Sequence, residues 1–221
     1  MEAEGEIMKK ISSALLAALL LLATVFTGAP AALAAGVSVN ATTVTVYFLN
    51  QEFREKISQP AAYPASFQLK VNGADKATYR VTAGESATVS STGLVEPLCT
   101  RYYWYGNVGS TAPTPGKTPD RVTESYTAGD STVQVTAGGK TFRVTVHVQS
   151  YAQVYVDSVM KDYIAKNLPA NPTDYNKAET AAKFAAQYEY SANYSSYLSM
   201  VILGGGDCWA STGSVNRMCS L

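Results

Sequence analysis

The sequence has little cysteine, a single histidine and few charged residues. Three cysteines and one histidine form no recognisable metal-binding cluster, and an odd cysteine count leaves at least one thiol outside any intramolecular disulfide. Basic and acidic residues each number 17, and neither kind forms a run. Electrostatic binding to nucleic acid therefore has no support. We predict no metal ion, no cofactor and no nucleic-acid partner.

The one long apolar run lies near the N-terminus. The pair Lys9-Lys10 precedes an uncharged apolar segment, residues 11–26, and Ala32-Leu33-Ala34 provides small residues for cleavage. This order is typical of a secretory signal peptide. We predict a leader over residues 1–34, with Met8 as a candidate true start; a retained membrane anchor is the alternative. The mature protein is then secreted or held at the cell surface, without a stable membrane span.

Signals for short β-strands dominate the expected mature chain up to Ser150. Residues 43–48 alternate between apolar and polar side chains, as a half-buried strand does. Clusters of glycine, proline, asparagine and aspartate separate several further candidates. These candidates are residues 67–71, 78–82 and 101–105.

The clearest unit in this region is a β-hairpin. Residues 132–136 and 141–148 flank the turn Ala137-Gly138-Gly139, and the second strand has valines on one face and polar residues on the other. His147 belongs to the polar face and is interpreted as a solvated surface residue. Many short strands at this spacing predict an antiparallel immunoglobulin-like β-sandwich over residues 35–150.

After Ser150 the apolar period becomes helical. The first predicted helix has an apolar face made of Val156, Val159, Met160, Tyr163 and Ile164. The proline-containing segment 168–172 ends it, and Thr173 or Asp174 can cap a second helix. The packing face predicted for that helix consists of Ala178, Ala181, Ala182, Ala185 and Tyr188. A polar, tyrosine-rich loop over residues 188–197 is expected to follow, and it can flank a substrate groove.

Three glycines and an aspartate precede Cys208. Asp207 is a good N-cap, which predicts a third helix over residues 208–219 with Cys208 at its first position. The positive end of the helix dipole and its unpaired N–H groups can face the sulfur and, later, an oxyanion. The glycines are interpreted as an adaptable backbone that lets a substrate approach, and Trp209 as an apolar wall. Cys208 is the candidate nucleophile.

The three cysteines also have structural interpretations. Cys208 can be a disulfide partner or an inert buried thiol. A continuous helix would place Cys208 and Cys219 roughly 16 Å apart, whereas a disulfide needs Cα atoms within about 7 Å. Cys99 stays open as a partner of either one, so the segment around Cys208 does not decide its role alone.

The order of motifs after Tyr155 resembles the opening of the transglutaminase-like, papain-like cysteine family. The matching segments are Asp162-Tyr163-Ile164, Thr173 to Lys177, Tyr188-Glu189-Tyr190 and Gly206 to Ala210. The resemblance covers about a third of the chain and matches Cys208 to the family's nucleophile. It implies attack on a protein or peptide amide through a thioester. An immunoglobulin-like module before such a domain is typical of exported bacterial members.

The chain departs from the family pattern after the cysteine. The family's catalytic histidine and aspartate follow the nucleophile on later strands, whereas His147 precedes Cys208. We therefore expect an α+β protein in which residues 151–221 are a truncated, mainly helical transglutaminase-like core that is inactive as this chain. The alternative function is a non-catalytic module that binds a cell-surface or cell-wall partner.

Overall fold

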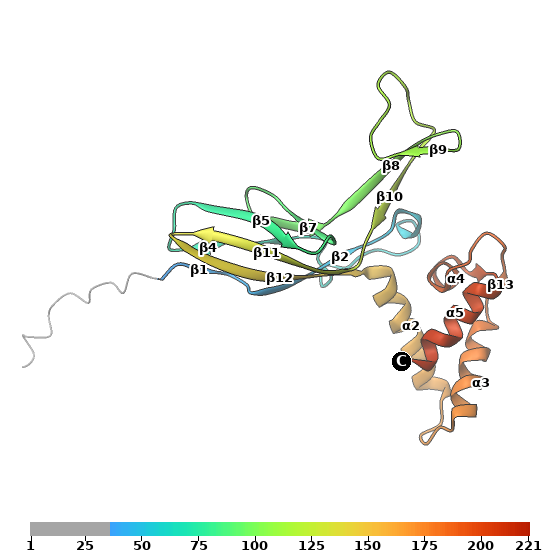
Figure 1. Ribbon diagram of the computed structural model, residues 1–221. Coiled ribbons are helices and arrows are strands. Elements are labelled where there is room, and N and C mark those ends of the chain that lie inside the picture. Colours follow the sequence, from blue (N-terminus) through green and yellow to red (C-terminus); the bar gives the residue numbers. More distant parts are fainter. Residues whose placement is uncertain (1–35) are drawn as a thin grey trace, which may run out of the picture.

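The computed structural model describes residues 36–221, which fold into a β-rich part followed by a helical part (Figure 1). The predicted leader, residues 1–34, lies outside the described residues. The strands up to Ser150 form several sheets, and four α-helices with one short pair of strands make up the rest. The prediction of an α+β fold is confirmed.

The largest sheet has four strands in the order β2-β12-β11-β5. These strands are β2 (Thr43–Phe48), β5 (Ala77–Ala83), β11 (Gly129–Ala137) and β12 (Lys140–Ser150). The expectation of purely antiparallel pairing is wrong at one place, because β2 and β12 run parallel. These two strands lie far apart in the sequence, so no hairpin obliges them to be antiparallel.

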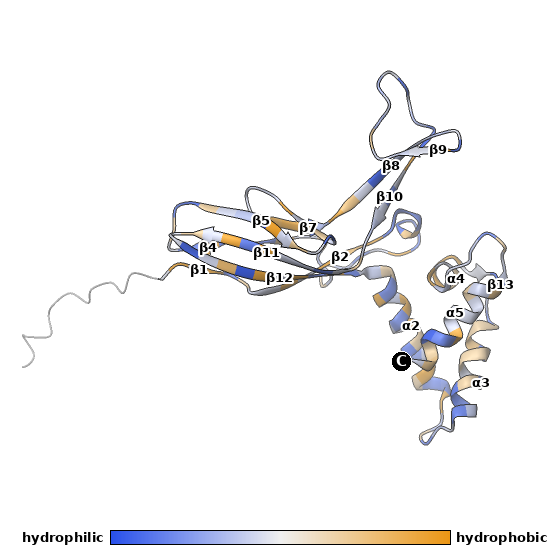
Figure 2. Ribbon diagram, in the orientation of Figure 1, coloured by the Kyte–Doolittle hydropathy of each residue, from blue (hydrophilic) through white to orange (hydrophobic). Residues whose placement is uncertain are grey.

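The hairpin β11–β12 confirms the sequence prediction with a tighter turn than expected. Ala137 pairs with Lys140, so the turn consists of Gly138 and Gly139 alone, at φ values of 54° and 75°. A two-residue hairpin turn of this kind needs positive φ at both positions, which glycine adopts without strain. Hydrophobic and hydrophilic residues alternate along both strands (Figure 2), and Val133, Val135 and the valines of β12 are buried.

A second sheet has three short strands in the order β3-β7-β6, namely β3 (Phe67–Gln68), β6 (Ala87–Val89) and β7 (Leu94–Pro97). The strand predicted over residues 67–71 is broken, because Phe67 pairs with β7 whereas Val71, in β4 (Val71–Asn72), pairs with β1 (Ser38–Val39). The four-stranded sheet and this second sheet contribute to one core. Its buried residues are Val44, Val46, Phe48, Leu69, Ala87, Val95, Val133, Val135, Val144, Val146 and Val148.

A third sheet projects from the β-rich part as an arm (Figure 1). Its strands are β8 (Cys99–Tyr105), β9 (Val108–Ser110) and β10 (Arg121–Tyr126), in the order β10-β8-β9. The strand predicted over residues 101–105 lies inside β8. In the arm, Arg121 stacks on the Trp104 ring at 4.5 Å from its centroid, and Val108 is 70% exposed.

The helical part begins immediately after β12. Ser150 caps α2 (Tyr151–Asn167), and Thr173 caps α3 (Asp174–Ala185) in a reciprocal capping box with Asn176. The predicted alanine face of α3 is only partly correct, since Ala178 and Ala182 are exposed. The buried face consists of Thr180, Ala181 and Phe184. The Phe184 ring packs on Tyr163 and Tyr188, and this aromatic contact sets which side of the helix faces the core.

Helix α4 (Tyr197–Leu203) was not predicted from the sequence. Ser196 caps its start, and Gly204 ends it in the left-handed conformation with φ 92°. Seven residues are too few to display a helical period, which is why the pattern did not reveal it. Before it, β13 (Glu189–Tyr190) pairs in parallel with β14 (Gly205–Gly206). The last helix is α5 (Cys208–Cys219), with the bounds predicted from the sequence.

A separate apolar cluster joins the β-rich part to the helices. The segment after β2, which includes the 3-10 helix η1 (Gln51–Phe53), packs against the first turn of α2. The buried members are Leu49, Phe53, Ile57, Tyr151 and Ala152, with residues of α4 packed against them. Because α2 is continuous with β12 and is also held by this cluster, the two parts have a packed junction.

Candidate functional site

Cys208 opens helix α5 and lines a cleft of about 530 Å³. One wall is α3, where Ala182, Ala185 and Ala186 leave room by being small. The other wall is the exposed side of α5, and Tyr188 and Tyr190 lie at the edge. Cys208 is exposed and has no disulfide partner. The thiol is therefore accessible from solvent inside a concave, mainly neutral surface.

Asp207 caps α5 as the sequence predicts. One carboxylate oxygen, Oδ1, accepts hydrogen bonds from the backbone N–H groups of Trp209 and Ala210, each at 2.9 Å. The other oxygen accepts a hydrogen bond from the Ser195 hydroxyl at 2.5 Å. Both oxygens of Asp207 thus accept hydrogen bonds, one from the first turn of α5 and the other from Ser195.

These contacts also set the charge state of Asp207. The hydrogen bond from Ser195, followed by that from the Ala210 N–H, lowers the pKa of Asp207 below its ordinary value of 3.8. Hydrogen bonds of this kind favour the charged carboxylate, because each donor stabilises the negative oxygen. The cap therefore stays ionised throughout the neutral and mildly acidic range.

The first turn of α5 has one backbone N–H without an acceptor among the described residues, that of Cys208. Asp207 engages the N–H groups of Trp209 and Ala210 through its side chain and that of Ser211 through its carbonyl. Within residues 36–221, no acceptor engages the N–H of Cys208. An unpaired N–H at a helix start is a suitable donor to an anionic oxygen. The sulfur and this donor belong to the same residue.

The glycines before Cys208 have a different role from the one expected. Gly204 ends α4, whereas Gly205 and Gly206 are buried in the strand β14. A Cβ on Gly206 would lie 2.7 Å from the Cβ of Ala210 and 2.9 Å from that of Met200. The segment is therefore closely packed between α4 and α5, and it fixes the start of α5 instead of supplying an adaptable backbone.

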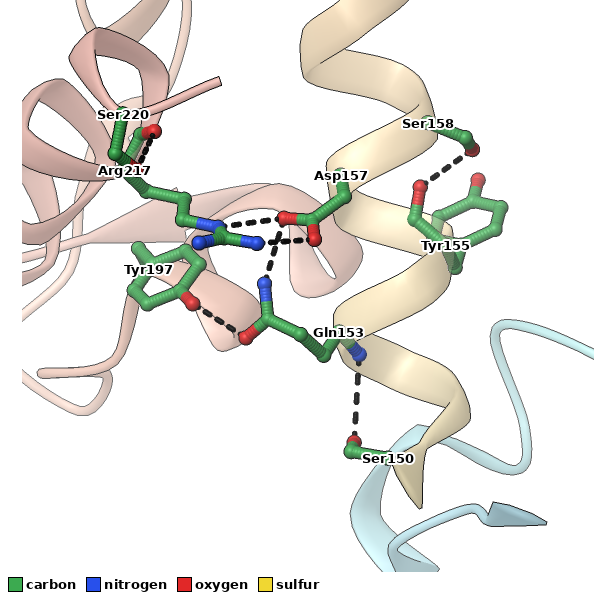
Figure 3. Close-up of polar contacts among 8 residues, drawn as sticks. All are labelled: Ser150, Gln153, Tyr155, Asp157, Ser158, Tyr197, Arg217 and Ser220. Carbon is green, nitrogen blue, oxygen red and sulfur yellow. Dashed lines mark hydrogen bonds and ion pairs between the residues drawn. The ribbon is translucent and has the colours of Figure 1, made fainter. Parts of the chain in front are cut away.

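A polar network holds α5 near its C-terminal end (Figure 3). Arg217 of α5 donates through Nε to Asp157 of α2 at 2.8 Å and contacts its second oxygen through Nη2. The Gln153 side chain donates to Asp157 at 2.6 Å and accepts a hydrogen bond from the Tyr197 hydroxyl. Three helices, α2, α4 and α5, thus meet in one network, and the ion pair with Asp157 raises the pKa of Arg217.

The other residues singled out in the sequence lie elsewhere. Trp209 is 74% exposed and does not line the cleft, so its expected role as a wall is wrong. Cys219 ends α5, Cys99 starts β8, and both are free. His147 contacts Asp130 at 2.6 Å on the β-rich part, partly exposed as predicted for a surface residue. No described histidine lines the cleft that contains Cys208.

Several residues of the cleft were missed by sequence reasoning. Ala182 and Ala185 were interpreted as helix packing, and Ala186 was not singled out. Ser195, which contacts Asp207 at the edge of this region, was assigned no role. The alanine spacing does reveal a smooth helical face, but the sequence alone does not say whether such a face is covered. The tyrosines expected beside a groove, Tyr188 and Tyr190, do line the cleft.

Neither a scan against protein-family models nor a search of curated proteins matched this chain. Over residues 36–221, no helix is both long and apolar enough to cross a membrane. The same residues contain no group of three or more His, Cys, Asp or Glu side chains placed to hold a metal ion.

Proposed function

We propose that this chain is a secreted, transglutaminase-like thiol protein in which Cys208 is the nucleophile. In this proposal residues 35–150 form an immunoglobulin-like sandwich and residues 151–221 form part of a papain-like core. The observation that carries it is the position of Cys208, an exposed free thiol at the start of α5 that lines a cleft. The order of motifs from Asp162 to Ala210 supports the same family.

The proposed chemistry is acyl transfer or hydrolysis at a protein or peptide amide. The Cys208 thiolate attacks the carbonyl carbon, and the carbonyl oxygen becomes an oxyanion beside the free N–H of the same residue. Collapse of this intermediate expels the amine, which takes up a proton, and leaves a thioester on Cys208. Water or a second amine then releases the acyl group and restores the thiol.

In this scheme Cys208 is the nucleophile and its own N–H is the oxyanion donor. A general base normally takes the proton of the thiol and gives one to the leaving amine. His147, the one histidine of the sequence, lies on β12 and not in the cleft. The proposal therefore predicts reaction with acyl donors whose leaving group needs no proton, and slow or absent turnover of unactivated amides.

An activated ester tests the nucleophile alone, because its leaving group departs without a proton from a general base. Incubation with p-nitrophenyl acetate should transfer one acetyl group to Cys208 as p-nitrophenolate departs, and peptide mass spectrometry locates that acetyl group. Cys219→Ala is the matched control, since it removes an exposed thiol from the other end of the same helix. We expect this variant to acetylate like the parent and Cys208→Ala to lose the adduct. Equal acetylation of Cys99, Cys208 and Cys219 would refute a nucleophile role.

The second candidate function is a non-catalytic module that binds a cell-surface or cell-wall partner. The projecting arm favours it, because Tyr102, Val108 and Val122 are exposed there on a sheet away from the main core. Exposed aromatic and apolar side chains are common at binding surfaces. Co-sedimentation with purified peptidoglycan, weakened by Tyr102→Ala and unaffected by Cys208→Ala, would support this function. The absence of co-sedimentation would count against it.

A further inference from the structure

A second cleft, of about 750 Å³, lies in the β-rich part and shares no residue with the cleft at Cys208. Its walls come from the segment after β2, from the end of β7 and from the base of the arm. Its volume lies within the usual range for small-molecule sites, about 300 to 1,000 Å³. It is therefore large enough for a small ligand and independent of the proposed thiol chemistry.

The walls of this cleft are fixed by contacts that are already present. Arg54 donates through Nε to the Leu49 carbonyl at 3.1 Å and through Nη2 to Glu124 at 2.6 Å. The rings of Phe48 and Tyr126 stack with centroids 5.0 Å apart. Together these contacts join the segment after β2 to the arm. A site held in this way loses little conformational freedom when a ligand binds.

Two arginines contact one glutamate at the arm side of the cleft. Glu124 lies between two guanidinium groups, with Arg54 at 2.6 Å and Arg101 at 3.5 Å. Burial opposes its ionisation, but hydrogen bonds from Arg54 and Tyr126 outweigh burial and lower the pKa of Glu124. Two positive charges thus share one negative charge. Arg101 is the loosely held partner, 61% exposed, and it has N–H donors free for an anion.

Tyr126 lines the same cleft and stays neutral. Burial, together with the neighbouring thiol of Cys99, raises the pKa of Tyr126 to about 12, so its hydroxyl remains protonated and donates to Glu124. Tyr126, Pro97 and the exposed Leu98 supply apolar surface in the cleft that Arg101 also lines, whereas Phe48, stacked on Tyr126, is buried. Such a surface suits a planar ligand body.

One further charge limits the ligand. Glu96 also lines the cleft and is exposed. Its carboxylate repels any anion, and it repels a dianion about twice as strongly as a monoanion, so a singly charged anion is favoured over a dianion. We propose that this cleft binds a small monocarboxylate with a flat apolar body, its carboxylate paired with Arg101 and its body against Tyr126 and Leu98.

The test uses N-benzoylglycine as the probe and N-benzoylglycinamide as its neutral counterpart, titrated into ¹⁵N-labelled protein. A probe of about 13 heavy atoms is expected to bind with a Kd on the order of 1 mM. We expect amide shifts around Leu98 and Tyr126, with the acid binding about tenfold more tightly than the glycinamide. Equal affinity of the two probes, shifts that map elsewhere, or no shifts would overturn the proposal.

Three variants localise the preference for the acid. Arg101→Gln should bring the affinities of acid and amide within about twofold of each other, since it removes the charged donor. Arg121→Gln is the matched control, because Arg121 is on the same arm but outside this cleft, and it should keep the full preference. Glu96→Gln should raise the affinity for the acid by about two- to fivefold. A preference that persists in the Arg101 variant would contradict the assigned contact.

Discussion

Gly206 fixes the position of Cys208 through close packing, and replacing it tests that role. In Gly206→Ala, the new methyl carbon would lie 2.7 Å from the Cβ of Ala210 and 2.9 Å from both Cβ and Cγ of Met200. Ordinary contacts between such carbons are about 3.5 to 4.0 Å. Both neighbours are buried and belong to helices, so the strand or a helix must move.

The expected loss is about 1 to 3 kcal/mol in the free energy of unfolding, the usual cost of overpacking a dense core. Urea denaturation followed by circular dichroism measures it. Gly204→Ala serves as a comparison, since its Cβ would meet open space and its cost comes from a φ of 92°. That backbone cost is about 1 to 2 kcal/mol. Only the Gly206 variant should also change the alkylation rate of Cys208, because it displaces the start of α5.

A rescue variant separates overpacking from a general loss of flexibility. Ala210→Gly removes the methyl group that the new side chain would meet and by itself costs about 1 kcal/mol as a glycine in a helix. In the double variant Gly206→Ala with Ala210→Gly, the closest contact disappears. We expect the double variant to be more stable than the sum of the single effects predicts, by at least about 0.5 kcal/mol. Strictly additive losses would refute the packing explanation.

Three further predictions concern the surroundings of α5. Ser214 is fully buried, and its hydroxyl has no partner among residues 36–221, so Ser214→Ala should raise thermal stability, by about 1 kcal/mol. Asp157→Asn weakens the ion pair with Arg217, which is 35% exposed and therefore partly screened; denaturant titration should show a loss of about 1 kcal/mol. The lowered pKa of Asp207 means that its stabilisation is present above the ordinary carboxyl value of 3.8 and is lost as the pH falls through its folded value. Asp207→Asn still caps but does not titrate, so its unfolding midpoint should depend less on pH in acid than that of the parent, and an unchanged acid dependence would contradict this assignment.

Local sequence signals were sufficient to predict several elements of the fold. The two glycines and the alternating valines predicted the β11–β12 hairpin, and Asp207 predicted the start of α5 at Cys208. Thr173, one of the two candidate caps predicted for α3, is the residue that caps it. Each of these signals lies within a few residues of the element that it specifies. Turn and cap chemistry depends on local backbone donors and φ values, which is why the sequence reveals it.

The missed features depend on residues that are distant in the sequence. The break after Gln68 arises because Phe67 and Val71 pair with different strands. The packing role of Gly206 requires Met200 and Ala210 to be brought around it, and short helix α4 has too few residues for a visible period. Sequence reasoning likewise placed Cys208 correctly but could not show that α3 would form a wall beside it. Tertiary packing determined all of these features.

We propose that the start of α5 makes Cys208 a reactive thiol. Cys208 and Cys219 are both exposed and lie at opposite ends of one helix, so each molecule contains its own comparison. The positive end of the helix dipole attracts a thiolate, and the negative end repels it. Residue-resolved iodoacetamide labelling of the folded protein at low salt measures both rates by peptide mass spectrometry. We predict that Cys208 alkylates several times faster than Cys219; equal rates, or faster labelling of Cys219, would contradict the account.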